Sequence, residues 1–419
     1  MEQKEYLEFT RVTRNLKGYR PGKGFNEKRI FENLNNGSFR YTEGCIGVKV
    51  GIHKPKSRVY GMERWDEMVT ETMEAGWHLS KTKKMEEVLV EENKTWIKDE
   101  EIRKIVERLI AFQNEYIAEN TSKKIDNLPD SELEKGKQII DYLMNHQCEL
   151  TVSQFNWVYM KYLEYIPRNI KHLDSLLARS EDDYLGIIER ERDFYEMILG
   201  YLKRNRKEPG KDFLMANGIS MRLVTKEEKE WLQKELGNSC SLVNAWSMES
   251  KERVAVFDSF CKKHGLSNGH GIYYLKHGTR SENVLSIMIN GIKIYPGKVK
   301  ADVVITGKAL GIGAYHAEDA EKSRGYTSIN DSKWARGGNR TGFMFLNRVA
   351  TGTKEMQYEP LRCDSSLTWE KLQKIKPGAL STWYHKDANV DRNFHFYKNE
   401  IVTYRDEQID GKCYLVEFQ

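Results

Sequence analysis

Apolar residues follow two different spacings along this chain of 419 residues. Through residues 95–205 they recur at intervals of three and four, which is the spacing of a helix face. On both sides of that stretch, short runs of β-branched and aromatic residues are broken by glycines, as in strands joined by turns. The pattern predicts an α+β, multidomain chain with an all-α helical bundle between two β-containing parts.

The N-terminal part combines strands with one helix. Closely spaced glycines lie among β-forming residues in positions 37–51, which predicts short strands joined by tight turns. From Glu63 onward apolar residues recur at three and four, which predicts a helix that ends before Gly76. We therefore expect a small β-rich domain in which one helix lies across a short sheet.

The central part carries apolar faces and helix-end signals. In a capping box, Ser or Thr precedes Glu or Gln by three residues, and the pairs Ser131/Glu134 and Thr151/Gln154 fit that rule. Pro167 predicts that a helix ends at the residue before it. The apolar positions that define the faces are Ile102, Ile105, Val106, Leu109, Phe112, Ile139, Ile140, Leu143, Phe155, Val158, Tyr159, Tyr162, Leu173, Leu176, Leu177, Tyr184, Ile187 and Ile188.

The C-terminal part, from residue 213 onward, alternates strand-like and helix-like pieces. Residues 284–289 predict a short helix, and residues 343–346 and 414–418 predict strands. No regular β-α-β succession appears, so a mixed domain with antiparallel sheets is favoured over a doubly wound sheet. A basic stretch at residues 203–210 predicts the linker that precedes this domain.

Composition narrows the class of protein. Hydrophobic residues make up 39% of the chain and charged residues 31%, which favours two to four folded domains over a disordered chain. No run of about 18 apolar residues exists, and the N-terminus lacks the apolar core of a signal peptide, so we expect an intracellular protein with no membrane partner. The six cysteines are scattered without zinc spacing, which predicts reduced thiols and no metal.

The charge of the chain is unevenly distributed. The net charge is +5, but residues 1–60 alone hold 13 Lys and Arg against 6 Asp and Glu. This part therefore carries an excess of +7, and the remainder of the chain is at −2. Such a basic region is expected of a protein that binds a phosphate backbone, and it is equally compatible with a basic face that maintains solubility.

Three short motifs in the C-terminal part carry the candidate chemistry. His277 lies in the segment YLKHGTR, Tyr315 in GIGAYHAE and Glu400 in NEIVTY. In this order they resemble the His-Tyr-Glu signature of the poly(ADP-ribose) polymerase (PARP) family. The resemblance implies a transferase that uses NAD as an ADP-ribose donor rather than as a redox cofactor, with His277, Tyr315 and Glu400 as catalytic residues.

The resemblance also implies how the nicotinamide end of NAD is held. In the family, a serine and a second tyrosine follow the tyrosine of the signature by eight and eleven positions, which leads here to Ser323 and Tyr326. Gly278 lacks a side chain, so its backbone can approach the carboxamide, to which the Ser323 hydroxyl also bonds. Tyr315 and Tyr326 would stack on the two faces of the nicotinamide ring.

The remaining NAD contacts follow from the same resemblance. His277 would bind a hydroxyl of the adenine-side ribose, and Thr279 stands where the family commonly has serine. Lys293 stands where a basic residue commonly faces the adenosine or phosphate portion of the donor. A glutamate at the position of Glu400 can stabilise the developing ribosyl cation and polarise an acceptor hydroxyl. In the family such a glutamate accompanies chain elongation, so Glu400 favours polymer synthesis.

Two further resemblances concern the rest of the chain. Residues 1–92 are similar to a WGR domain through the glycines at 44, 47 and 51 and the pair at 76–77. The Trp-Gly-Arg tripeptide that gives the domain its name is replaced here by Glu43, Gly44 and Cys45. The chain therefore lacks, at this position, an arginine that could bind a phosphate group. Residues 93–208 resemble the PARP helical regulatory domain, through the segment FNWVYMKYLEYIP, and residues 209–419 the catalytic domain.

The resemblances together imply a DNA-damage-responsive PARP that modifies proteins, including itself, and releases nicotinamide. Its partners would be NAD, DNA ends or breaks, and protein acceptors. The compact layout is similar to bacterial or phage members, and the location would be cytoplasmic in bacteria or nuclear in eukaryotes. Two alternatives remain open. One is a mono-ADP-ribosyltransferase or NAD glycohydrolase with a non-DNA trigger, and the other is a catalytically silent NAD- or DNA-binding scaffold.

Several other features carry less weight. Gly311 and Gly313 lack the third glycine of a dinucleotide-binding fingerprint, and Lys308 lacks the Ser or Thr and upstream glycine of a P-loop. His316 and His385 are expected to be incidental. Residues 381–385 place bulky aromatics where the family has a glycine-rich loop, which predicts an altered acceptor choice.

Overall fold

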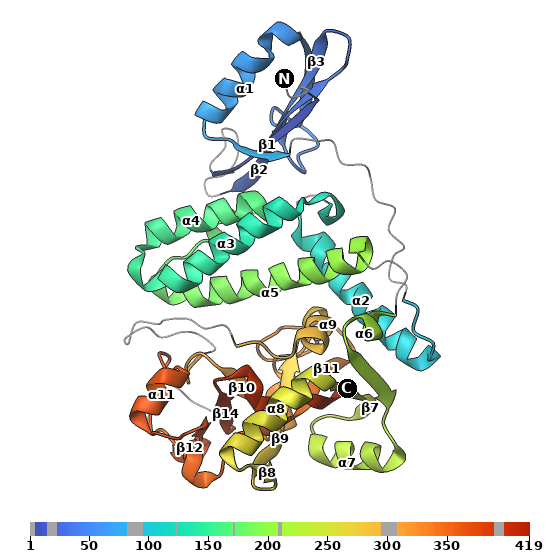
Figure 1. Cartoon of the computed structure of the whole chain (residues 1–419), viewed down its shortest axis with the longest axis vertical. Coiled ribbons are helices and arrows are strands. Elements are labelled where there is room, and N and C mark those ends of the chain that lie inside the picture. Colours follow the sequence, from blue (N-terminus) through green and yellow to red (C-terminus); the bar gives the residue numbers. More distant parts are fainter. Residues whose placement is uncertain are drawn as a thin grey trace. The chain divides into compact units, whose positions relative to one another are not determined.

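A computed structural model describes residues 5–14, 23–81, 95–122, 124–170, 172–207, 212–294, 308–388 and 398–419. The chain forms two compact units (Figure 1). One unit comprises residues 1–90 and 117–206, and the other comprises residues 91–116 and 207–419. The mixed α+β class predicted from the sequence is confirmed, because both helices and several sheets are present. The predicted boundaries at residues 92/93 and 208/209 remain predictions.

The first unit begins with a five-stranded sheet in the order β4-β3-β2-β1-β5. All its strand pairs are antiparallel. The helix α1 covers one face, where Trp65 packs among Phe9, Phe31 and Phe39. The predicted sheet with one helix across it is therefore confirmed. The elements are β1 (Tyr6–Arg14), β2 (Gly24–Asn33), β3 (Ser38–Cys45), β4 (Lys56–Gly61), η1 (Met62–Arg64), α1 (Trp65–Glu74) and β5 (His78–Lys81).

The helices that follow in the chain are α2, whose residues up to 116 belong to the second unit, and a group that packs within the first unit, where α4 contacts β1 and η4 contacts β2. Their buried residues include Phe155, Tyr159 and Tyr162 of α4 and Tyr184 of α5. The elements are α2 (Glu100–Asn120), η2 (Ile125–Asn127), α3 (Asp130–His146), η3 (Gln147–Glu149), α4 (Val152–Tyr165), η4 (Leu173–Ser175), η5 (Glu181–Asp183), α5 (Tyr184–Leu202) and η6 (Lys203–Lys207). The linker predicted at 203–210 lies within the described residues only as far as 207, where it continues α5.

One of the two predicted capping boxes is confirmed and the other is wrong. Thr151 caps α4: its hydroxyl accepts from the Gln154 backbone N–H at 3.3 Å, and the Gln154 side chain accepts from the Thr151 N–H at 2.9 Å. The second box would need Ser131 as the first residue before a helix. Instead α3 begins at Asp130, with Pro129 before it and no side-chain cap.

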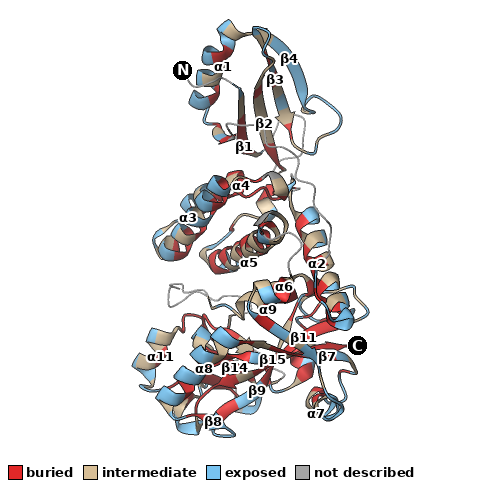
Figure 2. Cartoon of the chain, turned by 45° about the vertical axis from the view of Figure 1, so that its right-hand side comes forward, coloured by how far each residue is buried: buried red, intermediate tan, exposed pale blue. Residues whose placement is uncertain are grey.

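The second unit contains two sheets. A six-stranded sheet has the order β6-β7-β15-β11-β9-β8, and a four-stranded sheet has the order β10-β14-β13-β12. The pairs are antiparallel except β8 with β9 and β12 with β13, which confirms the predicted antiparallel character. In Figure 2 the central strands β11 and β15 are largely buried.

The strands and helices of this unit include those predicted at 284–289, 343–346 and 414–418, which are confirmed. The elements are α6 (Phe213–Ala216), β6 (Ile219–Leu223), α7 (Lys226–Leu236), β7 (Leu242–Ser250), α8 (Lys251–His264), β8 (Ser267–Asn268), β9 (Gly271–Thr279), α9 (Ser281–Asn290), β10 (Ala314–His316), α10 (Ala320–Arg324), β11 (Gly342–Ala350), η7 (Lys354–Met356), β12 (Gln357–Tyr358), α11 (Trp369–Ile375), β13 (Ser381–Tyr384), η8 (Lys386–Ala388), β14 (Glu400–Thr403), η9 (Asp406–Gln408) and β15 (Ile409–Phe418).

The first helix predicted for the helical bundle packs on the six-stranded sheet instead. Val106 and Leu109 of α2 are fully buried in one apolar cluster with Phe343 and Leu415 of β11 and β15. Arg108 forms an ion pair of 2.8 Å with Glu417, whose side chain is buried. The apolar spacing of α2 identified a helix correctly but not its packing partner, because periodicity does not distinguish a helical neighbour from a sheet.

We expect Leu109→Ala to lower the free energy of unfolding by about 2–5 kcal/mol, because it removes a fully buried side chain from the sheet core. The measurement is urea unfolding of the whole chain followed by tryptophan fluorescence. Lys104→Ala on the exposed face of the same helix is the matched control, with an expected change within about 0.5 kcal/mol. Equal effects of the two substitutions would contradict a core role for α2.

Candidate active site

His277 and Tyr315 are joined where the two sheets of the second unit meet. The His277 Nδ1–H donates to the Tyr315 backbone carbonyl at 2.9 Å. A carbonyl oxygen only accepts, so the proton lies on Nδ1 and the lone pair lies on Nε2. Burial lowers the pKa of His277, which keeps the ring neutral at pH 7. His277 therefore offers an acceptor nitrogen rather than a charge.

Backbone pairing next to these residues links β9 to the segment after β10. The Lys276 N–H donates to the Ala317 carbonyl at 2.8 Å, and the Ala317 N–H donates to the Lys276 carbonyl at 2.9 Å. The Tyr315 hydroxyl donates to the Gly311 carbonyl and accepts from the Leu310 N–H, both at 2.9 Å. Because its hydroxyl is engaged in this turn, Tyr315 can offer a ligand only its ring.

Gly278 lies directly against the backbone of α10. A Cβ built at Gly278 would overlap the carbonyl oxygen of Ser323. Any side chain at this position would therefore push α10 away from β9. The sequence suggested that Gly278 is needed for access to a carboxamide; the structure adds that Gly278 allows α10, and with it Ser323, to approach the strand that carries His277.

Glu400 forms a buried ion pair with Lys322. The Lys322 Nζ lies 2.6 Å from the Glu400 Oε1, and their side chains are 8% and 7% exposed. Burial raises the pKa of Glu400, and the Lys322 ammonium opposes that shift. Burial likewise lowers the pKa of Lys322, and the Glu400 carboxylate opposes that shift. Each group thus favours the charged form of the other in a site that disfavours isolated charge.

A set of polar contacts attaches the segment before β14 to the segment around α10. The Asn399 side-chain amide donates to Glu318 at 3.0 Å. Lys398 forms ion pairs with Asp319 at 2.6 Å and with Glu321 at 3.0 Å. Such half-exposed pairs contribute little to stability, but they restrict where the chain enters β14. They therefore fix Glu400 opposite Lys322.

Tyr326 follows α10 and stacks on Trp334. The two ring centres are 4.5 Å apart with an interplanar angle of 21°, and the rings are 38% and 44% exposed. A Cβ at Gly325 would overlap the Trp334 indole, so the glycine makes room for it. The backbone N–H of Trp334 also donates to the backbone carbonyl of Gly325 at 3.0 Å. Burial, and then the charge of Glu400, raises the pKa of Tyr326, which places Tyr326 within electrostatic reach of Glu400.

The structure brings four of the eight candidate residues together in two contacts, His277 with Tyr315 and Gly278 with Ser323. Tyr326 lies close enough to Glu400 for the carboxylate charge to raise the pKa of Tyr326. Thr279 is buried at the end of β9, two residues after His277. Lys293 instead forms an ion pair of 3.3 Å with Asp406, which follows β14 at the end opposite Glu400. None of the described contacts links Lys293 to the other candidates.

Two residues of the site were missed from the sequence. Lys322 directly precedes Ser323 in the same short helix, and this proximity was the available signal. Trp334 had no signal, because nothing local reveals that it folds back onto Tyr326. His316, expected to be incidental, is buried with its ring centre 6.1 Å from that of His277, and burial lowers its pKa to about 3. It is a neutral core residue that contacts Thr403 at 3.3 Å.

The aromatics of residues 381–385 are core residues. Trp383 is 8% exposed and packs with Leu275 and Ile401, and Tyr384 is 1% exposed. Rings buried in this way do not present a surface to an acceptor, so the expectation that they alter acceptor choice by direct contact is not supported. His385 is half-buried and lies 3.5 Å from Glu359.

Comparisons with known proteins point to one family for the C-terminal part of the chain. Residues 222–419 match the family model of the poly(ADP-ribose) polymerase catalytic domain. A poly(ADP-ribose) polymerase-like protein of Invertebrate iridescent virus 6 is 27% identical over 134 residues, which is 32% of this chain. The match covers 64% of that relative, slightly less than two thirds of its length. The two matches indicate a PARP-like catalytic domain in residues 222–419.

The described residues contain neither a candidate metal site nor a candidate membrane span. No group of three or more His, Cys, Asp or Glu side chains is placed to hold a metal ion in the described part of the chain. The helices that the structure describes include none with the length and apolar character of a membrane span. All six cysteines lie in the described part of the chain, and none of them is bonded to another in a disulfide.

We expect Trp334→Ala to weaken nicotinamide binding about 3- to 10-fold, since Tyr326 loses the ring that orients it and such stacking contributes about 0.5–1.5 kcal/mol. Isothermal titration calorimetry with nicotinamide measures this change. Trp334→Phe retains a ring over Tyr326 and is expected to bind nearly as the wild type does. Unchanged or tighter binding by the alanine variant would mean that Trp334 does not support Tyr326.

Proposed function

We propose that this chain is an NAD-dependent ADP-ribosyltransferase that transfers ADP-ribose to protein acceptors, including itself, and releases nicotinamide. The observation that carries the proposal is the buried Lys322–Glu400 pair, 2.6 Å apart, in the same unit as the His277–Tyr315 bond. Both lie within the 222–419 region that matches the PARP catalytic domain. A buried carboxylate with its own cation is a costly arrangement that suits a catalytic site.

The reaction breaks the bond between the nicotinamide nitrogen and C1′ of the ribose. Nicotinamide departs with the bonding electron pair and needs no acid, because its nitrogen is already cationic in NAD. Positive charge develops on the ribose, as in glycoside cleavage. The site must therefore hold the nicotinamide, stabilise that charge and activate the acceptor.

The first task falls to residues on either side of the β9–α10 contact. The Gly278 backbone and the Ser323 hydroxyl would bind the carboxamide, and the Tyr315 and Tyr326 rings would face the nicotinamide. His277 would accept a hydrogen bond from a ribose hydroxyl at Nε2, because Nδ1 already donates to the Tyr315 carbonyl. Its neutral state suits this role, since a protonated ring could not accept.

Glu400 performs the other two tasks in this proposal. Its carboxylate would stabilise the ribosyl cation and take the proton from an acceptor hydroxyl as that oxygen bonds to C1′. Lys322 keeps the buried carboxylate ionised, because the ammonium opposes the rise in its pKa that burial causes. Lys322 is thus a positioning and charge-supporting residue for Glu400.

We expect Glu400→Gln to lower kcat about 10²- to 10⁴-fold with a small change in KM for NAD, the loss typical of a missing general base. In the wild type, activity should fall toward acid with an apparent pKa above the ordinary glutamate value, because burial raises the pKa of Glu400. Lys322→Met should move this acid limb to higher pH, since the opposing cation is gone. A Glu400→Gln variant that retains full turnover would remove Glu400 from the mechanism.

The finer part of the proposal is a response to DNA through residues 1–92. Cys45, which stands where the WGR arginine would, is 1% exposed and is not available to a phosphate. Lys49, Lys54 and Lys56 are exposed in and beside the loop between β3 and β4. No described carboxylate forms an ion pair with them, so these three cations are available to a phosphate backbone.

The helical segment 93–208 would pass this response to the catalytic residues as a WGR-linked regulatory domain. Its helix α2 supports the proposal, because it is continuous from one compact unit to the other. Residues 100–116 belong to the unit with the candidate site, and residues 117–120 belong to the unit with the five-stranded sheet. A bistable element biased by DNA could act through such a shared helix.

Incubation with labelled NAD, with and without nicked or blunt-ended DNA, followed by a denaturing gel, tests the finer proposal. We expect a DNA-dependent ladder on the protein, suppressed by higher salt. The variant with Lys49, Lys54 and Lys56 changed to glutamate should lose the DNA dependence but retain basal turnover. A single labelled band whose intensity does not depend on DNA would instead indicate mono-ADP-ribosyl transfer with another trigger. Release of nicotinamide with no label on the protein would indicate an NAD glycohydrolase.

A further inference from the structure

A pocket lies in the second unit, away from the candidate active site. It has a volume of about 510 Å³ and is lined by Ala255, Val256, Ser259, Phe260, Lys263, His264, Trp369, Arg405 and Glu407. Arg405 follows β14, whereas Glu400 begins that strand. Five residues of extended chain span roughly 16 Å, so the pocket is separate from the Lys322–Glu400 pair.

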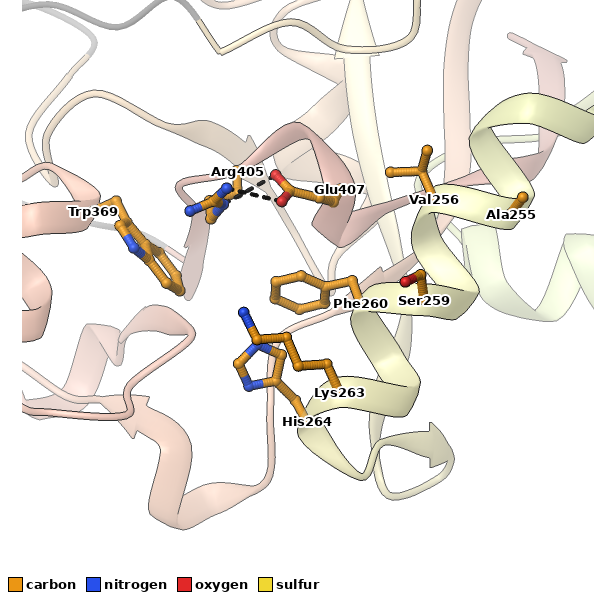
Figure 3. Close-up of a pocket in the computed structure, with 9 residues that line it drawn as sticks. All are labelled: Ala255, Val256, Ser259, Phe260, Lys263, His264, Trp369, Arg405 and Glu407. Atoms are coloured by element: carbon orange, nitrogen blue, oxygen red, sulfur yellow. Dashed lines mark hydrogen bonds and ion pairs between the residues drawn. The ribbon is translucent and has the colours of Figure 1, made fainter.

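Two aromatic walls bound this pocket. Figure 3 shows the Trp369 ring on one side and the Phe260 ring on the other, with open space between them. Phe260 is fixed, because it is 7% exposed and belongs to an apolar cluster against which Trp369 packs. Trp369 of α11 is only partly buried, so its ring can receive a planar group, and the buried Phe260 of α8, which lies against His264, forms the wall opposite it. Stacking of a base on such a ring contributes about 1–3 kcal/mol.

Two cations point into the same space. Arg405 donates from Nε and Nη2 to Glu407 at 3.0 and 2.9 Å, and its guanidinium lies 5.3 Å from the Trp369 ring centre. These contacts orient Arg405 and leave Nη1 without a hydrogen bond among the described residues. Lys263, in the last turn of α8, forms no ion pair with a described carboxylate, and Figure 3 shows its ammonium directed between the rings.

The two charges that act most strongly on His264 are positive. Lys263 and Arg405 are the two charges that lower the pKa of His264, after burial. Of the nearby acids, Glu407 is held by Arg405, and Asp406 is held by Lys293 at 3.3 Å. Glu370, on the exposed side of α11, is the remaining acid whose charge reaches Arg405. A phosphate placed at Lys263 would meet two cations and the neutral His264 ring.

We propose that this pocket binds a nucleotide, with a planar base on the Trp369 ring and a phosphate at Lys263 and Arg405. A ring and cations are both required for this ligand class, and the volume suits one nucleotide unit. An acidic peptide would use the cations but leave the Trp369 ring uncovered. A free nucleotide and an ADP-ribosyl group share this chemistry, and the proposal stands independently of the transferase reaction.

Calorimetric titration of the whole chain with ADP tests the proposal. We expect Lys263→Ala and Trp369→Ala each to weaken ADP binding about tenfold or more. Trp369→Phe keeps a ring and should bind close to wild type, which guards against misfolding of the alanine variant. Lys262→Ala is the matched control, because this exposed neighbour does not line the pocket. All four variants should release nicotinamide from NAD at the wild-type rate if the proposed transferase activity exists.

Three further arms separate the possible outcomes. His277→Ala should leave the Lys263-dependent binding intact, which distinguishes it from binding at the candidate NAD site. Adenosine and inorganic pyrophosphate should each bind more weakly than ADP, because each fills half of the pocket. Tighter binding of ADP-ribose than of ADP would identify an ADP-ribosyl group as the source. ADP affinity that is equal in wild type, Lys263→Ala and Trp369→Ala, or lost only in His277→Ala, would overturn the proposal.

Discussion

The candidate site depends on the close approach of α10 to β9, where Gly278 lies against the carbonyl of Ser323. This contact carries Lys322 into the protein to within 2.6 Å of Glu400. A buried charge is tolerated only when a partner is fixed beside it, and removal of one partner leaves the other uncompensated. The same short helix leads to Ser323 and Tyr326, so one backbone contact positions a cation, a hydroxyl and a ring.

The two sheets of the C-terminal unit contribute different parts of this arrangement. The six-stranded sheet supplies His277 through β9, and the four-stranded sheet supplies Tyr315 and Glu400 through β10 and β14. The His277–Tyr315 bond and the Lys276–Ala317 backbone pair join the sheets at this point. The site is therefore a junction whose geometry is set by strand pairing rather than by a loop, which suits a reaction that requires fixed groups.

Much of the local structure could be predicted from the sequence, because it depends on nearest neighbours. The spacing of residues within a single segment was enough to predict several elements: the helix at 65–74, the Thr151 cap and the strands at 343–346 and 414–418. The Ser131 cap was wrong because Pro129, which has the extended backbone of a cap position, takes that place two residues earlier, so the helix begins at Asp130. Local patterns cannot show where a helix packs, so the attachment of α2 to the sheet was missed.

The sequence motifs name candidate residues of the site, but they do not show the contacts around those residues. Local motifs pointed to His277, Tyr315 and Glu400, but the pairing of Glu400 with Lys322 joins segments far apart in the chain. Stacking of Trp334 on Tyr326 depends on how residues 325–335 fold back, which backbone hydrogen bonds from Trp334 and Ala335 to the Gly325 carbonyl determine. Such contacts appear only in three dimensions.

The central claim is that this site cleaves NAD at the nicotinamide–ribose bond and attaches ADP-ribose to an acceptor. The most direct measurement is to incubate the purified chain with NAD, quantify free nicotinamide, and record the intact mass of the protein. The account predicts nicotinamide release together with an increase in mass by one or more ADP-ribosyl groups. Unchanged NAD and unchanged protein mass, at NAD concentrations that saturate binding, would contradict it and indicate a binding protein instead.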